Sequence, residues 1–173
     1  MKPYLDMLSG ATDQIRAIRE IIISNIVLIG QIPAPTFQEQ RRAEYLIERM
    51  ADFQVDECAT DGFGNPVGII RGTAIDKPPI FVVAHLDTYF DSDTDFNYRI
   101  LENTIAGPGI TDNSLRAAVL VSLPEIFRRL ERRFSSDIVI AGVIQSMGQG
   151  NLRGVRHLLN TWPTPVRGAI CVE

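Results

Sequence analysis

A chain of 173 residues with a net charge of −4 and a pI near 5.2 lacks the basic surplus that a nucleic-acid-binding protein would carry. Its composition, 45% hydrophobic and 22% charged, is that of a globular protein with a sizeable core, so we expect one domain, residues 1–173. Two distant cysteines, no signal-peptide core and no apolar run long enough to span a bilayer predict a cytoplasmic protein without membrane attachment.

The first part of the chain predicts two helices followed by strands. Apolar residues at three- and four-residue spacing predict an amphipathic helix over residues 12–29. Thr36 and Glu39 have the spacing of a capping box, so we expect Thr36 to be the N-cap of a helix that runs to about Met50. The charged residues of this helix, Arg42 among them, are expected on a solvated face. Three strands are expected next, over residues 54–58, 66–71 and 80–84.

The second part of the chain alternates helices and strands. A helix is expected over residues 113–133, and Pro124 should kink it or split it. The apolar run 137–144 predicts a buried strand, followed by a helix over 151–160 and a last strand over 167–172. This alternation implies parallel βαβ units. We therefore expect an α/β fold of three layers, with helices on both sides of a mostly parallel sheet.

The strand expected over residues 80–84 leads directly into His85 and Asp87. Because side chains of a strand alternate between its faces, these two point the same way, at the end of the sheet where open α/β folds bind ligands. A carboxylate beside an imidazole can fix its tautomer and raise its basicity as a metal ligand. Taken alone, the pair is more simply interpreted as the polar exit of a buried strand.

Asp112 is a second candidate, placed between a tight turn and a helix. The turn is made by the glycines and proline at 107–109, and the helix is the one expected over 113–133. A carboxylate at this place satisfies free amide groups and suits the positive end of the helix. From the pattern alone, Asp112 is therefore as readily an N-cap as a metal ligand.

Three motifs together resemble a known family, the zinc exopeptidases and deacylases that include peptidase T, carboxypeptidase G and acetylornithine deacetylase. The motifs occur in the same order here: His85-Leu86-Asp87-Thr88, residues 107–114 and residues 150–154. Residues 33–37 and 61–65 also resemble signatures of that family. The resemblance implies the N-terminal part of a catalytic domain that holds two zinc ions, without the family's smaller dimerisation domain. It leaves homo-oligomerisation open.

The resemblance also implies roles for individual residues. His85 corresponds to a ligand of one zinc ion, and Asp87 to the carboxylate that orients this histidine. Asp112 corresponds to the carboxylate that bridges the two ions, and Glu173 to a further ligand of the His85 zinc. His85, Asp112 and Glu173 would then complete the protein ligands of one ion.

The paired glutamates of that family are missing from this chain. The first, a general base, falls on Ser146, and the second, a ligand of the other zinc, falls on Met147. A serine hydroxyl does not ionise near pH 7, and losing a general base costs about 10²–10⁴-fold in rate. Methionine is a poor ligand for a hard metal site. No Glu or Asp lies between Asp137 and Glu173, so the loss is independent of where alignment gaps are placed.

Three hypotheses about function remain open. The replacements at Ser146 and Met147 favour a catalytically impaired relative of the zinc peptidases and N-acyl amino acid amidohydrolases, with one zinc ion at most. The set of His85, Asp87 and Asp112 would also suit an active metal-dependent hydrolase of small peptides or acyl amino acids. The third hypothesis is an unrelated α/β binding domain.

Overall fold

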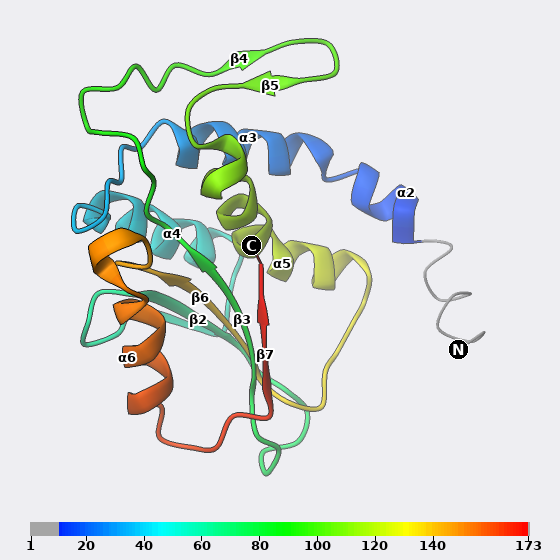
Figure 1. Cartoon of the computed structure of the whole chain (residues 1–173). Helices are drawn as coiled ribbons and strands as arrows, with labels where there is room; N and C mark the ends of the chain where they lie inside the picture. Colours follow the sequence, from blue (N-terminus) through cyan, green and yellow to red (C-terminus); the bar gives the residue numbers. More distant parts are fainter. Residues whose placement is uncertain (1–10, 173) are drawn as a thin grey trace.

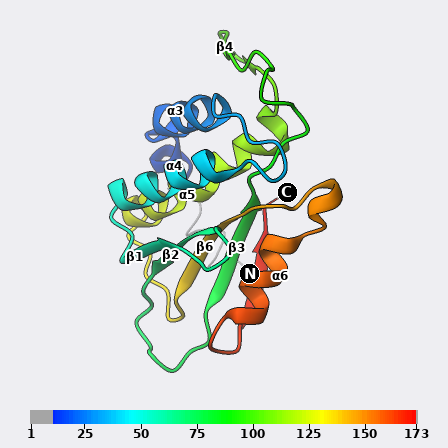
Figure 2. The same cartoon turned by 90° about the vertical axis from the view of Figure 1, so that its left-hand side faces the viewer.

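The structure, a computed structural model, describes residues 11–172. A five-stranded sheet lies at its centre, with helices packed on both faces (Figure 1 and Figure 2). The helices are α2 (Ala11–Arg16), α3 (Arg19–Gly30), α4 (Gln40–Asp52), α5 (Leu115–Arg129) and α6 (Arg153–Thr161). The strands are β1 (Glu57–Thr60), β2 (Pro66–Ile70), β3 (Ile80–His85), β4 (Arg99–Ile100), β5 (Ile105–Ala106), β6 (Ile138–Val143) and β7 (Gly168–Cys171).

The strand order of the central sheet is β1-β2-β6-β3-β7. Strand β2 pairs antiparallel with β1 and β6, whereas β3 pairs parallel with both β6 and β7. Four of the five strands therefore run in one direction, which confirms the mostly parallel sheet. In the register of β3 and β6, His85 pairs with Val143, so the two strands end at the same edge. Strands β4 and β5 form a separate hairpin (Figure 1).

Helices cover the two faces of the sheet unequally. Helices α3, α4 and α5 lie on one face, and α6 lies on the other (Figure 2). The core under the three helices includes Ile29, Leu46, Leu120 and Ile140, and the core under α6 includes Phe81, Val83, Val139 and Leu158. This arrangement confirms the predicted three layers. Among residues 11–172, no helix combines the length and hydrophobicity that crossing a membrane requires.

Several predicted elements differ in detail from those observed. The helix expected over 12–29 is divided into α2 and α3, and α6 begins at Arg153, two residues after Asn151, which adopts a left-handed conformation. Helix α5 is not split at Pro124 and ends at Arg129, earlier than expected. Pro124 is buried in this helix, and packing of the helix against the sheet outweighs the missing backbone hydrogen bond.

The predicted capping box is wrong. Helix α4 begins at Gln40 and has no side-chain cap. The Thr36 hydroxyl instead donates to Asp87 Oδ2 at 3.0 Å, and Glu39 Oε1 accepts from the backbone N–H of Gln145 at 2.7 Å. Both side chains therefore connect the start of α4 to the edge of the sheet where β3 and β6 end.

Candidate functional site

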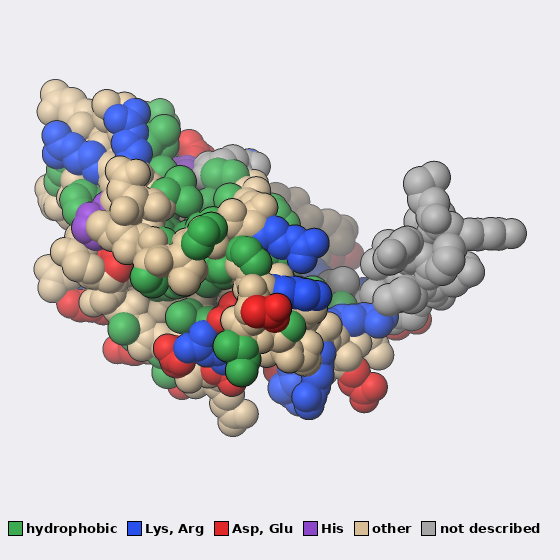
Figure 3. Space-filling view, turned by 90° about the horizontal axis from the view of Figure 1, so that it is seen from below, with side chains coloured by type: hydrophobic (Ala, Val, Ile, Leu, Met, Phe, Trp, Pro, Cys, Tyr) green, Lys and Arg blue, Asp and Glu red, His purple; other side chains and the backbone are tan. Residues whose placement is uncertain are grey.

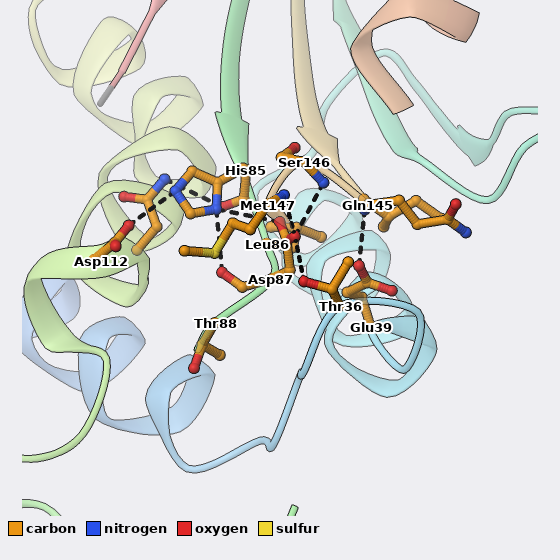
Figure 4. Close-up of polar contacts among 12 residues, drawn as sticks. Thr36, Glu39, His85, Leu86, Asp87, Thr88, Asp112, Gln145, Ser146 and Met147 are labelled. Carbon is orange, nitrogen blue, oxygen red and sulfur yellow. Dashed lines mark hydrogen bonds and ion pairs between the residues drawn. The ribbon is translucent and has the colours of Figure 1, made fainter. Parts of the chain in front are cut away.

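The structure brings His85, Asp87 and Asp112 together at the end of β3 (Figure 4). His85 Nε2 lies 3.0 Å from Asp112 Oδ1, and Nδ1 lies 3.3 Å from Asp87 Oδ1 and 3.1 Å from the Asp87 carbonyl oxygen. His85 and Asp87 are buried, whereas the Asp112 side chain is 49% exposed. The imidazole therefore lies between two carboxylates, one of them open to solvent. Glu173, the other expected ligand, lies outside the described residues.

Asp87 connects this histidine to the loop that follows β6. Its Oδ2 accepts hydrogen bonds from the backbone N–H groups of Ser146 at 3.0 Å and Met147 at 2.7 Å, in addition to the Thr36 hydroxyl. Burial by itself would raise the pKa of Asp87, but the contacts with His85, the Met147 amide and Thr36 outweigh it and lower the pKa. Asp87 is therefore an ionised carboxylate whose two oxygens serve different partners.

Asp112 is not the N-cap of α5. It lies in an irregular turn, Ile110–Ser114, where Asp112 and Asn113 have non-helical backbone angles, and the helix begins at Leu115. The turn follows Gly109, whose φ of +66° lies in the left-handed region that glycine adopts without strain. Asn113 Nδ2 donates to the His85 carbonyl at 3.2 Å, which connects this turn to the end of β3. The turn thus directs Asp112 to His85 instead of to the helix.

Ser146 and Met147, in the loop after β6, lie beside His85 (Figure 4). They line a cleft of about 460 Å³ together with His85 and Asp112. The Ser146 hydroxyl oxygen is buried and has no hydrogen-bond partner among residues 11–172. In the part of the chain that the structure describes, Asp112 is the sole carboxylate among the residues that line this cleft.

Two larger cavities lie away from this site. One, of about 550 Å³, lies between β1 and α6. The other, of about 620 Å³, is formed by the loops before β3 and β7, at the opposite end of the sheet. Figure 3 views the molecule from that end, where hydrophobic side chains are interspersed with basic and acidic ones. The convergence of ionisable groups, not the size of the cavity, therefore identifies the site.

Sequence reasoning missed the buried arginine under the site. Arg42 was expected on a solvated face, but it is 1% exposed. Its guanidinium donates to the carbonyl of Leu86 at 2.8 Å and, through two nitrogens, to the carbonyl of Ile32. Burial lowers the pKa of Arg42 to about 10, so it stays charged at neutral pH. The burial of Arg42 could have been inferred from its position four residues before Leu46, on the apolar stripe of α4.

The burial of Glu39 was not predicted from the sequence either. This burial makes the stability of the fold depend on pH. Burial raises the pKa of Glu39, against the opposing hydrogen bond from the Gln145 amide. The folded chain therefore keeps a proton there at pH values where the unfolded chain has released it. The stability from this proton is present below the unfolded pKa and is lost as pH rises through the folded pKa.

We accordingly expect Glu39→Gln to be more stable than wild type at neutral pH, with a difference that shrinks as the pH falls. Glutamine keeps an acceptor oxygen for the Gln145 amide but carries no charge into the buried site. Urea denaturation between about pH 4 and about pH 7 measures the difference in the free energy of unfolding. A difference that stays constant, or grows toward low pH, would contradict the expectation.

The described residues at this site would supply only part of one zinc site. Among residues 11–172, no three His, Cys, Asp or Glu side chains are grouped so that they could hold a metal ion. His85 and Asp112 supply an imidazole and a carboxylate, the donor types that zinc prefers, and Asp87 contacts the other ring nitrogen as a supporting carboxylate does. Ser146 and Met147 supply no carboxylate for a second ion.

The sequence matches no protein-family model, and a search of curated proteins finds no match. Solved structures do match the fold. They include Dug1p, a dipeptidase from Saccharomyces cerevisiae (TM-score 0.72, 15% identity, 95% of this chain and 40% of that one). They also include the aminopeptidase PepT from Bacillus cereus (TM-score 0.60, 16% identity, 72% and 36%). A third is YxeP from Bacillus subtilis, described as a dinuclear metal binding peptidase from the M20 family (TM-score 0.61, 15% identity, 90% and 43%).

These matches concern the fold. The chain has the mixed α/β fold of the peptidase catalytic domains, and it spans about two fifths of the length of each of these three structures. The resemblance to these peptidases is therefore confirmed for the fold alone.

Proposed function

We propose that this chain is a metallopeptidase-like domain that binds one zinc ion at His85 and Asp112 and has lost most or all hydrolytic activity. The ligand class it retains would be small peptides or acyl amino acids. We take residues 1–173 as one cytoplasmic domain, in keeping with the low cysteine content, two residues far apart in the sequence (Cys58 and Cys171).

One observation carries the metal assignment: both ring nitrogens of His85 face carboxylate oxygens, those of Asp87 and Asp112. A neutral imidazole has one N–H, so it can donate to only one of two carboxylates. The second contact then needs a further proton or a cation. A zinc ion held by Nε2 and Asp112, with Nδ1–H donating to Asp87, satisfies all three groups. Glu173 would supply a third ligand by resemblance.

The proposed loss of hydrolytic activity rests on the residues of the loop after β6. A hydrolytic water needs a group that accepts its proton, and this role belongs to a carboxylate or imidazole of suitable pKa. Ser146 and Met147 offer neither, and the carboxylate of Asp112 is committed to the metal in this proposal. The domain would therefore hold a zinc ion, which acts as a Lewis acid when bound, without the base that turnover requires.

Purified wild type is expected to contain about one zinc ion per chain, and His85→Ala and Asp112→Ala are each expected to lose it. Elemental analysis after gel filtration measures the content. His157→Ala, which removes the chain's other histidine, and Asp91→Ala, in an exposed loop, are the matched controls and should keep the metal.

Either of two results would contradict the proposal. Zinc retained in both site variants would place the metal elsewhere, and wild type that binds no added zinc would remove the assignment. Hydrolysis of dipeptides or acyl amino acids by wild type, abolished by His85→Ala, would show an active enzyme instead of an impaired one.

A further inference from the structure

Two sulfur-bearing side chains line the same cleft as His85. Met147 comes from the loop after β6 and Cys171 from β7, and both border the cleft of about 460 Å³. Three segments that are distant in the sequence therefore bring an imidazole, a thioether and a thiol to one edge of the sheet. The zinc assignment uses only the first of these groups.

The register of the sheet places Cys171 on the same side as His85. Strands β3 and β7 are parallel, and Val83 pairs with Cys171, so their side chains share a face. His85 lies two residues after Val83, so its side chain points to that face as well. This is the face that α6 covers, because Val83 belongs to the core beneath that helix. Cys171 is exposed, so an ion can reach it from solvent.

The backbone of Met147 is held in place next to the histidine. Its N–H donates to Asp87 Oδ2 at 2.7 Å, and its carbonyl accepts from the N–H of Gly150 at 2.8 Å. The side chain extends to the side of the His85 ring and Asp112 (Figure 4). The thioether therefore enters the cleft from a fixed point of the chain.

We propose that this cleft binds a soft monovalent ion, Cu(I), through Met147 Sδ, Cys171 Sγ and His85 Nε2. Thiolate and thioether sulfur are soft ligands that favour Cu(I), and imidazole also suits copper. The thiol releases its proton on binding, so the thiolate and Cu(I) form a neutral unit. The same ligands around a divalent ion would leave a net positive charge.

The lining of the cleft suits a neutral unit over most of its wall, with Asp112 as the one carboxylate among the described lining residues. Apolar side chains make up much of its wall: Val83, Val143, Leu152 and Val155. Charge is costly to place against such a wall unless it is compensated. This copper site rests on the proposed zinc site in that both use His85, so the two ions should compete for it. Asp112 would bind only zinc, and Met147 would bind only copper.

Cu(I) binding is tested by competition with the chromophoric chelator bicinchoninate, under argon with ascorbate, on the full chain. We expect one Cu(I) per wild-type chain. Losing a group that merely supports a ligand weakens metal binding about 10- to 100-fold, so Met147→Leu and Cys171→Ser should weaken it at least as much. Cys58→Ser removes the other thiol, on β1, and should leave the affinity unchanged.

The variants also separate this inference from the proposed zinc site. Met147→Leu conserves side-chain volume, and unchanged urea denaturation would show that it folds. Asp112→Ala should lose zinc and keep Cu(I), and Met147→Leu should do the reverse. X-ray absorption of the copper complex should show both sulfur and nitrogen neighbours. Wild-type affinity in Met147→Leu, or an equal effect of Cys58→Ser and Cys171→Ser, would overturn the copper site and leave the zinc site standing.

Discussion

Arg42→Ala is expected to lower the free energy of unfolding by about 3–5 kcal/mol. The guanidinium of Arg42 is fully enclosed and donates to the carbonyls of Leu86 and Ile32. Alanine leaves both acceptors without this donor, at about 1–3 kcal/mol for each buried group, and opens a cavity between α4 and β3. Because Leu86 lies between His85 and Asp87, the loss also loosens the strand end that carries the site.

Arg41 offers a matched control on the same helix. It precedes Arg42 and is exposed, so Arg41→Ala should change stability by no more than about 0.5 kcal/mol. Urea denaturation followed through Trp162, the chain's single tryptophan, measures both variants. If the two alanine variants were equally stable, the carbonyl contacts of Arg42 would contribute nothing measurable to the fold.

Asp87→Ala is expected to lower the free energy of unfolding by about 3 kcal/mol and to make the loop after β6 more mobile. The carboxylate is 0% exposed, and its removal leaves the Thr36 hydroxyl and the amides of Ser146 and Met147 without their acceptor. Asp87→Asn keeps one acceptor oxygen, so its free energy of unfolding should fall by less. The same denaturation measures the stability, and hydrogen exchange of the two amides reports on the loop.

The loop readout distinguishes this role from a general loss of packing. In Asp87→Ala, the amides of Ser146 and Met147 should exchange faster than those of β6, which lie in the sheet. Asp93→Ala, in an exposed loop, is the control and should change neither measurement. Uniform acceleration across the chain would argue against a specific connection between Asp87 and the loop.

The sheet could be predicted because its strands carry strong local signals. The apolar runs 80–84 and 137–144 became β3 and β6, since strands buried on both faces are apolar throughout. The hairpin β4–β5 could not be predicted, because each strand has two residues and no periodicity to detect. The division between α2 and α3 was missed because apolar residues continue at helical spacing across it, with Ile18 buried at the junction.

Site residues could be predicted where the type of residue and the alternation of the strand indicate the same position. His85 and Asp87 are two residues apart at a strand end, so alternation alone placed them together. Thr36, Glu39 and Arg42 were assigned to local roles, because a helical pattern reflects contacts between sequence neighbours, whereas each of these side chains contacts a partner 44 or more residues away. Asp112 stayed ambiguous for another reason: a cap and a ligand require the same carboxylate at the same place.

The hydrogen bonds from Ser146 and Met147 to Asp87 come from their peptide groups. Every amino acid except proline provides that donor, so the shape of the loop is insensitive to which side chains stand at these two positions. A carboxylate, a hydroxyl or a thioether can stand at either position without loss of these two hydrogen bonds. Single substitutions at either position can therefore change the chemistry of the cleft while the backbone contacts with Asp87 stay in place.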